Sequence, residues 1–458
     1  MTDQVTAGAE RPQGSGYANY VILALFVVYT FNFIDRQIVA VMQEPIKAHF
    51  DLSDLQLGLL TGPAFALLYA VLGLPIAYLA DRWNRVSIIS IALAVWSAFT
   101  ALFGLVNSYW MLFLMRVGVG IGEAGCSPPA HSLISDYVPP RKRAGAMSVY
   151  SLGIPIGSVL GILITAIVYR WIADYYAENG APEFLAAIGA DVAWRVTFLL
   201  IGIPGVLLAI LVKLTVKEPV RGRFDGAAQD GSRASLGDVV RALSKKSSFW
   251  YLAFAAAIAS LVGYGLFPWL LSYFIREAFI ADPTLSLQDA LANAAIPYSF
   301  VIGGGGFVGT LAGGYLTDRF SGKWLGAYVA IPGTALLISL PIYFVSLTIP
   351  PTWIAFLLLG IASALGAMWY GPVWAVAQNL VKPSMRAMAP AVLLFIINVI
   401  GLGMGPPAVG ALSDYLREAY GDAALRYAIL AIAGMIIPAA GLFLLASRSV
   451  AKDWEAGE

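Results

Sequence analysis

Long apolar runs separated by short polar segments dominate this chain of 458 residues. A helix that crosses the hydrocarbon core of a bilayer needs about 20 predominantly apolar residues. Twelve runs of that length occur, six on each side of a polar stretch in the middle of the chain. The pattern predicts an all-α membrane protein with twelve transmembrane helices, near residues 19–42, 56–80, 86–106, 109–133, 145–169, 194–216, 249–275, 295–317, 324–347, 351–378, 388–412 and 425–446.

The central polar stretch divides the chain into two six-helix bundles. Within this stretch, Ser235 is placed to cap a short helix that ends near Lys245. The basic face of such a helix suits the anionic inner leaflet of a membrane. The predicted domains are a tail over 1–18, a first bundle over 19–216, a linker over 217–248, a second bundle over 249–447 and a tail over 448–458.

The composition agrees with a membrane protein. The chain is 59% hydrophobic and only 12% charged, whereas soluble domains contain about 25% charged residues. The net charge of +1 gives no reason to expect a nucleic-acid partner. Cys126 is the only cysteine, which excludes an internal disulfide and a cysteine-rich metal site. We expect a monomer whose partners are the lipid bilayer and a small solute.

Basic residues are distributed unequally between the two sides of the predicted membrane. With the N-terminus inside, 20 Lys and Arg residues fall in cytoplasmic segments and six fall outside. Cytoplasmic loops of membrane proteins carry the excess of basic residues. The distribution predicts that both termini are cytoplasmic, in a bacterial inner membrane or an equivalent one.

The two halves of the chain repeat one another. The sequence Tyr-Leu-Ala-Asp-Arg-Trp over 78–83 matches Tyr-Leu-Thr-Asp-Arg-Phe over 315–320, each after the second predicted helix of its half. Pro129 likewise matches Pro372. Parallel repeats of six helices place a solute site at their interface, near the bilayer midplane.

The repeated segment also carries a family resemblance. The sequence Gly-Leu-Pro-Ile-Ala-Tyr-Leu-Ala-Asp-Arg-Trp-Asn-Arg over 73–85 resembles the signature loop of the major facilitator superfamily. A narrower similarity to the Spinster branch rests on Asn-Phe-Ile-Asp-Arg over 32–36, on Arg-Val-Gly-Val-Gly-Ile-Gly-Glu-Ala over 116–124 and on Glu-Pro over 218–219. This resemblance covers nearly the whole chain. It implies two pseudo-symmetric six-helix bundles, alternating access and secondary active transport.

Four ionisable side chains lie deep in the predicted spans, and all four belong to the first half: Asp35, Arg36, Arg116 and Glu123. A charge at this depth costs at least ~2.5–3.5 kcal/mol on insertion scales, so each is a functional candidate. Asp35 and Arg116 each lie about 10 Å below the outer end of their helix, which predicts that they pair. Glu123 lies ~10 Å deeper on the same face of its helix as Arg116.

A carboxylate holds its proton weakly beside an arginine and tightly after losing that partner in a low-dielectric site. Proton coupling requires such a difference. We therefore predict Asp35 and Glu123 as proton-coupling residues, H+ as the coupling ion and no cofactor. Arg36 and Arg116 are predicted to bind the solute. A buried ion pair that only fixes helix packing is the alternative interpretation.

The family resemblance implies a gate at the signature loop. Asp81 at the inner end of helix two is expected to bind basic or amide groups and so hold the halves together on that side. Plain helix capping is the alternative. The predicted gating residues are Asp81, Arg82, Arg85, Arg143, Asp318 and Arg319.

Helix five contains Gly153, Pro155 and Gly157. Proline frees a backbone carbonyl, and small residues permit close helix packing. These residues are predicted to form a hinge, with tight packing alone as the other interpretation.

Aromatic residues take the place of charges in the second half. Tyr264 and Phe267 lie in helix seven, and Trp369 and Tyr370 lie in helix ten. We predict that they line a solute site, although packing explains them equally well.

One charged wall and one aromatic wall together suit an amphipathic solute. The predicted function is proton-coupled secondary transport, by alternating access, of a lysolipid, a sphingoid lipid or a lipophilic drug-like compound. Two alternatives stay open, a symporter of small organic anions and a membrane receptor or scaffold that transports nothing. The sequence contains no cluster of His, Cys or metal-ligand residues that would point to an enzyme.

Overall fold

The computed structural model describes residues 15–222, 224, 236–350, 352–382, 385–386 and 388–455. Most of the predicted N-terminal tail, the centre of the linker with Ser235, and the last three residues lie outside this part. Every described element is a helix, and each of the twelve predicted runs is helical. The described part of the linker contains α12 (Leu236–Ser244).

The first half contains six spans, several of them built from two helices in succession. The shorter α2 (Gln43–Phe50) and α10 (Glu183–Ala187) lie between spans. The spanning helices are α1 (Ser15–Val41), α3 (Asp54–Thr61) with α4 (Pro63–Ala80), α5 (Arg85–Phe103), α6 (Tyr109–Glu123) with α7 (Ser127–Tyr137), α8 (Pro140–Ser151) with α9 (Gly153–Asn179), and α11 (Ala193–Thr215).

The second half repeats this arrangement. A π-helical turn, η2 (Asn398–Leu402), interrupts the eleventh span of the chain, and η3 (Gly421–Ala423) joins the last two spans. The spanning helices are α13 (Ser247–Ala281), α14 (Leu287–Ser321), α15 (Ala327–Thr348), α16 (Trp353–Ala367) with α17 (Tyr370–Asn379), α18 (Met388–Ile397) with η2 and α19 (Gly403–Tyr420), and α20 (Ala424–Ala433) with α21 (Ile436–Asp453).

Ten helical segments of the described chain are long and apolar enough to cross a membrane. The segment over 388–453 contains two of the predicted runs, and the predicted run 109–133 is divided between α6 and α7. The prediction of an all-helical protein with many membrane spans is therefore confirmed.

Prolines explain three of the breaks within spans. A proline has no N–H and leaves the carbonyl four residues earlier without its helical partner. Pro155 follows the break between α8 and α9, and Pro372 follows the break between α16 and α17. Pro129 follows the break between α6 and α7, so the matched prolines of the repeat interrupt corresponding helices.

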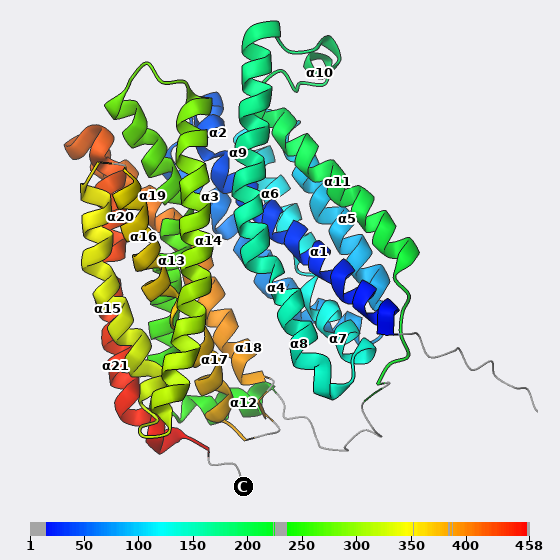
Figure 1. The fold of residues 1–458 in the computed structure, drawn as a ribbon, viewed down its shortest axis with the longest axis vertical. Coiled ribbons are helices and arrows are strands. Elements are labelled where there is room, and N and C mark those ends of the chain that lie inside the picture. Colours follow the sequence, from blue (N-terminus) through cyan, green and yellow to red (C-terminus); the bar gives the residue numbers. More distant parts are fainter. Residues whose placement is uncertain are drawn as a thin grey trace, which may run out of the picture.

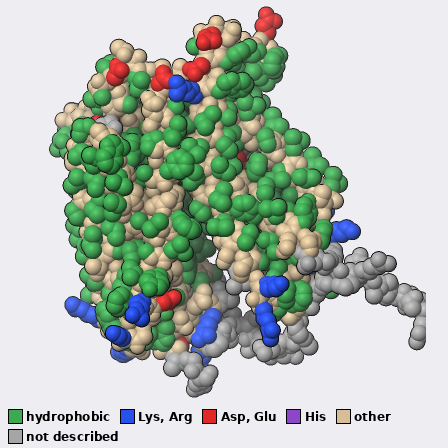
Figure 2. Space-filling view, viewed as in Figure 1, with side chains coloured by type: hydrophobic (Ala, Val, Ile, Leu, Met, Phe, Trp, Pro, Cys, Tyr) green, Lys and Arg blue, Asp and Glu red, His purple; other side chains and the backbone are tan. Residues whose placement is uncertain are grey.

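The charges agree with a bilayer around the middle of the molecule. Figure 2 shows most of the visible Lys and Arg at the end where α1 begins and α21 ends, and most of the visible Asp and Glu at the opposite end. A broad hydrophobic band lies between them. We call the two ends the termini end and the Glu44 end, after the residue of α2 that lies there.

The two halves lie close together at the Glu44 end and diverge toward the termini end (Figure 1). Helix α3 packs on α19, and α9 packs on α14. A Cβ added at Gly58 would lie only 2.6 Å from the Pro406 carbonyl oxygen, and one at Gly410 only 2.3 Å from that of Asp54. The absence of side chains at these glycines therefore lets the halves meet closely.

Candidate functional site

The deep charges of the first half gather between α1 and α6. Arg36 Nε donates a hydrogen bond of 2.6 Å to Glu123 Oε2. The Glu123 side chain is fully buried, and that of Arg36 is 17% exposed. The structure therefore pairs Arg36 with Glu123, whereas the sequence predicted a pair between Asp35 and Arg116.

Asp35 and Arg116 lie in the same cluster and are almost completely buried. The charges that act on Asp35 are those of Glu123 and Arg116. Neither carboxylate oxygen of Asp35, nor Nε of Arg116, has a hydrogen-bond partner among the described residues. A buried polar or charged atom without a hydrogen-bond partner is costly, so protonation, a bound ligand or a rearrangement would stabilise this cluster.

Both arginines contact the same aromatic ring. The guanidinium carbons of Arg36 and Arg116 lie 4.9 and 4.8 Å from the centroid of the Phe65 ring. The Tyr69 ring lies 4.9 Å from Arg36 and stacks on Phe65. Such contacts stabilise a cation without neutralising it. Arg36 therefore keeps the charge with which it binds Glu123, and Arg116 keeps a charge that can bind an anion. Sequence reasoning missed Phe65 and Tyr69, although their spacing of four residues places both on one helix face.

The predicted aromatic residues of the second half lie near this cluster. Tyr264 of α13 is within electrostatic range of Arg36 and Tyr69, and Tyr370 is within range of Tyr264. The Trp369 and Tyr370 rings stack with centroids 4.2 Å apart at the break between α16 and α17. Tyr264 and Tyr370 are half-buried, whereas Trp369 is buried.

Phe267 lies one turn beyond Tyr264 on α13 and is half-buried. Its backbone oxygen accepts a hydrogen bond of 2.5 Å from the Tyr298 hydroxyl of α14. The position of this part of the aromatic wall is therefore fixed by a neighbouring helix.

Arg85 of the signature loop joins two helices of the first half to the segment that follows α11. It is buried at the start of α5 and donates to Asp136 Oδ2 of α7 at 2.5 Å. It also donates to Glu218 Oε1, just after α11, at 2.6 Å and to the Ser132 hydroxyl at 2.7 Å. In this structure, its contacts stay within one bundle.

The other predicted gating residues of the first half lie at the termini end. The backbone oxygen of Asp81 accepts a hydrogen bond from Arg221, and Arg82 lies 3.8 Å from the Tyr78 ring centroid. Arg143 donates to the Ser135 backbone oxygen at 2.9 Å. Tyr78 is 58% exposed, in agreement with halves that diverge at this end.

The matching residues of the second half also lie at the termini end. The Tyr328 hydroxyl donates to Asp318 Oδ1 at 3.4 Å, and Arg319 is exposed. The described contacts of Asp81 and Asp318 thus do not join the two halves in this conformation.

Helix five packs on α1 through its predicted hinge glycines. A Cβ at Gly157 would lie 2.5 Å from the Thr30 carbonyl oxygen, and one at Gly153 would lie 3.0 Å from the Thr30 nitrogen. The chain also breaks from α8 to α9 at Leu152, three residues before Pro155. Close packing and a break in the helix thus occur at the same place.

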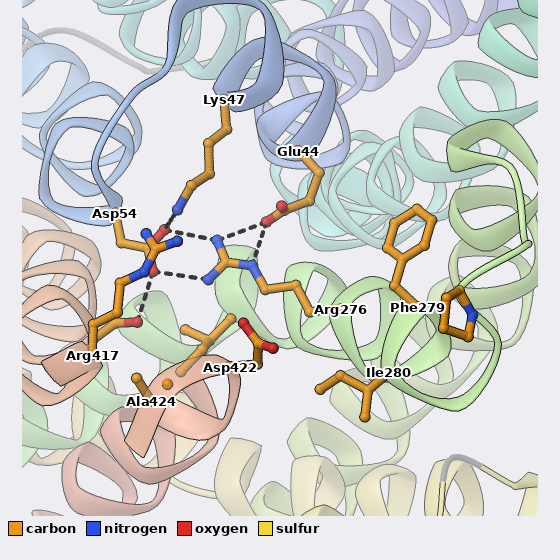
Figure 3. Close-up of a pocket in the computed structure, with 13 residues that line it drawn as sticks. Glu44, Lys47, Asp54, Arg276, Phe279, Ile280, Arg417, Asp422 and Ala424 are labelled. Atoms are coloured by element: carbon orange, nitrogen blue, oxygen red, sulfur yellow. Dashed lines mark hydrogen bonds and ion pairs between the residues drawn. The ribbon is translucent and has the colours of Figure 1, made fainter. Parts of the chain in front are cut away.

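An ion-pair network joins the two halves at the Glu44 end (Figure 3). Arg276 of α13 donates to both carboxylate oxygens of Asp54, at 2.8 and 2.7 Å, and to Glu44 at 3.0 Å. Asp54 also accepts from Lys47 and from the Ser413 hydroxyl. These residues border a pocket of about 550 Å³. We call this network, made of Glu44, Lys47, Asp54, Arg276 and Ser413, the outer clamp.

A second aspartate strengthens the same contact. The carboxylate of Asp414 in α19 accepts from the backbone N–H groups of Asp54 and Leu55 at 2.9 and 2.8 Å. Negative charge is favourable at a helix N-terminus, and here it comes from the opposite half. Arg276 is one of the six basic residues that the charge distribution placed outside the membrane, and its role could not be predicted because its partners depend on how the halves dock.

Comparison with known proteins agrees with this architecture. The profile of the Major Facilitator Superfamily matches residues 25–406. The chain therefore belongs to this family, whose members are transporters and not enzymes. An "MFS-type efflux pump" of Mycolicibacterium smegmatis is 31% identical, over 94% of this chain and 92% of its own length.

Within the superfamily, the chain falls in the Spinster branch. The "Sphingosine-1-phosphate transporter SPNS2" of Danio rerio is 27% identical, over 92% of this chain and 83% of its own. The crystal structure of a bacterial homolog of the human lysosomal transporter Spinster, in an inward-facing and unoccupied conformation, is 34% identical with a TM-score of 0.86. That likeness covers 97% of this chain and all of the other. The protein is thus an integral membrane secondary transporter.

Proposed function

We propose that this protein transports an amphipathic lipid or a lipophilic drug-like compound by proton-coupled alternating access. The observation that carries the proposal is the contrast between the two walls of the site. Buried charges of α1 and α6 lie on one side, and half-buried aromatic side chains of α13 and α17 lie on the other. The relatives named as a sphingosine-1-phosphate transporter and an efflux pump support a solute of this kind.

In this proposal, the ionic head of the solute binds the arginines of the cluster. The Glu123 carboxylate is paired with the Arg36 guanidinium in the present structure. When Glu123 takes up a proton, Arg36 becomes available to an anionic head group, and loss of the proton returns Arg36 to Glu123. Asp35 takes up the second exchangeable proton beside Arg116. The apolar body of the solute packs against Tyr264, Phe267, Trp369 and Tyr370.

The orientation completes the proposal. We place both termini in the cytoplasm, which makes this a conformation that is closed at the outer clamp and open toward the cytoplasm. During the cycle, the outer clamp opens and the signature loops meet. Gly153, Pro155 and Gly157 let helix five adapt to this rearrangement.

The decisive experiment measures binding of alkyl phosphates and lysophospholipids of increasing chain length to the purified protein. Replacing Arg36 or Arg116 by Ala removes a charge-assisted hydrogen bond worth about 1.5–3 kcal/mol, so anionic compounds should bind about 10- to 150-fold more weakly. Truncating Tyr370 should cost affinity in proportion to chain length, by up to ~0.8 kcal/mol per methylene no longer buried.

Two controls separate solute binding from proton coupling. Glu123→Gln should flatten the pH dependence of binding without changing the preference for long chains. The matched control is Glu418→Gln, because Glu418 is exposed at the end of α19. Equal losses for every chain length in the Tyr370 variant would refute the apolar wall and favour a symporter of small organic anions. No flux of any bound compound in liposomes would favour a receptor.

A further inference from the structure

A second hollow opens on the flank of the C-terminal half, between α14, α15 and α16. Its volume is about 670 Å³, within the range of sites that bind small molecules. We call it the lateral groove. Its lining is Val308, Gly309, Ala312, Leu316, Trp324, Ala330, Ile331, Thr334, Ala335, Ile338, Ile361, Ala364, Leu365 and Met368.

Small residues form the floor of the groove and large ones form its rims. A Cβ at Gly309 would lie 1.9 Å from the Ala364 carbonyl oxygen, so the backbones of α14 and α16 are in contact there. This contact closes the floor. On the rims, Val308, Ile338 and Ile361 are between 44% and 57% exposed, so the groove faces outward along the membrane-spanning surface.

Apart from the Trp324 indole at its end, the groove has one side chain with a polar atom, Thr334. Its one hydroxyl, on Thr334, donates to the Ala330 backbone oxygen at 2.8 Å. The occupant of the groove must therefore be an alkyl chain, because any polar group placed there would lose its hydrogen bonds to water.

The position of the groove identifies the leaflet. From Val308 to Leu316 it follows α14 for about 12 Å, less than half of the ~30 Å hydrocarbon core. Trp324 closes it at the termini end, and Trp is typical of the membrane–water interface. The exposed side chains of Arg319 and Lys323 lie beside this end of the groove, and neither forms an ion pair with a described residue.

We propose that the lateral groove binds one acyl chain of an anionic bilayer phospholipid from the leaflet at the termini end. Its phosphate binds Lys323 and Arg319 beside the Trp324 ring. The lipid is a resident of the bilayer and not the transported solute, because the closed floor separates the groove from the Arg36–Glu123 cluster. This site is independent of the proposed transport function.

The test uses the full-length protein in phosphatidylcholine nanodiscs that contain increasing fractions of phosphatidylglycerol with brominated acyl chains. Bromine quenches nearby tryptophan fluorescence. The fluorescence of Trp324 is obtained by subtracting the fluorescence of the Trp324→Phe variant from that of the unmodified protein. We expect brominated phosphatidylglycerol to quench Trp324 at a lower fraction than brominated phosphatidylcholine. Lys323→Gln should raise the fraction needed about fivefold.

Groove-filling variants and a matched control complete the design. Ala312→Phe and Ala335→Phe fill the groove from opposite walls, and each should abolish the preference for phosphatidylglycerol. Lys382→Gln removes another exposed lysine at the termini end, away from the groove, and should leave quenching unchanged. Equal quenching by both lipids, or a preference that survives both Phe variants, would overturn the proposal. Displacement of the brominated lipid by a transported solute would also overturn it.

Discussion

Replacing Asp54 by Asn should open the Glu44 end of the molecule. The carboxylate of Asp54 receives two hydrogen bonds from Arg276 and one from Ser413, all across the two halves. Asn keeps the size of the side chain but loses the charge. A hydrogen bond to a charged group contributes about 1.5–3 kcal/mol.

The Asp54→Asn substitution destabilises almost only the closed conformation, because the hydrogen bonds that it removes cross the interface between the halves. Since Arg276 is 21% exposed, we use a loss of about 2 kcal/mol, which shifts the ratio of open to closed molecules about 30-fold. The shift can be measured from spin-label distances between Ala48→Cys and Glu418→Cys, on opposite halves, with Cys126 replaced by Ser. Both labelled positions are exposed at the Glu44 end.

Lys47 provides the matched control. It also binds the Asp54 carboxylate but belongs to the same half. Lys47→Gln should therefore weaken the network without changing the balance between conformations. An unchanged distance distribution in Asp54→Asn, or an equal change in Lys47→Gln, would refute the role of the outer clamp.

Three further predictions concern other contacts. Arg85→Ala leaves the buried Asp136 without its partner, and should lower the free energy of unfolding by about 3–5 kcal/mol, seen as a lower melting temperature in detergent. Gly410→Ala places a methyl group against the Asp54 backbone and should also lengthen the spin-label distances, whereas Gly314→Ala, with open space around it, should not. The hydrogen bond from Lys246 lowers the pKa of Glu455, so this contact stabilises the segment that follows α21 above the ordinary carboxyl pKa and weakens as pH falls. In the Lys246→Gln variant, titration should show the pKa of Glu455 returning toward its ordinary value.

The sequence was sufficient to predict the helices because the bilayer makes apolar length the dominant signal. Each predicted run is helical. Pro129 and Pro372 were matched only as evidence of the repeat, and the structure adds that each follows a break in its helix. The four deep charges lie together, although only Asp35 and Arg116 were predicted to pair. Depth along a helix did not predict the right pairs, however. Arg36 reaches Glu123 because its long side chain extends toward the deeper carboxylate, whereas helical spacing alone placed Arg116 beside Asp35.

The outer clamp could not be predicted in the same way. Asp54 and Arg276 are 222 residues apart, and both stand near the ends of predicted spans, where charges are common. Their pairing depends on the angle between the two bundles. Phe65 and Tyr69 were missed for another reason: aromatic side chains in a membrane helix are ordinary until a guanidinium is found beside them.

A nearly continuous helical segment connects the Arg36–Glu123 cluster to the outer clamp. Arg36 lies in α1, and Glu44 lies eight residues later in α2, with Met42 as the only residue between the helices. Eight residues of helix span about 12 Å. A displacement of α1 that releases Arg36 from Glu123 therefore also moves Glu44 relative to Arg276. Because the same rigid segment holds both contacts, we expect Glu123→Gln and Asp54→Asn to have non-additive effects on the spin-label distances. Additive effects would show that the two sites respond independently.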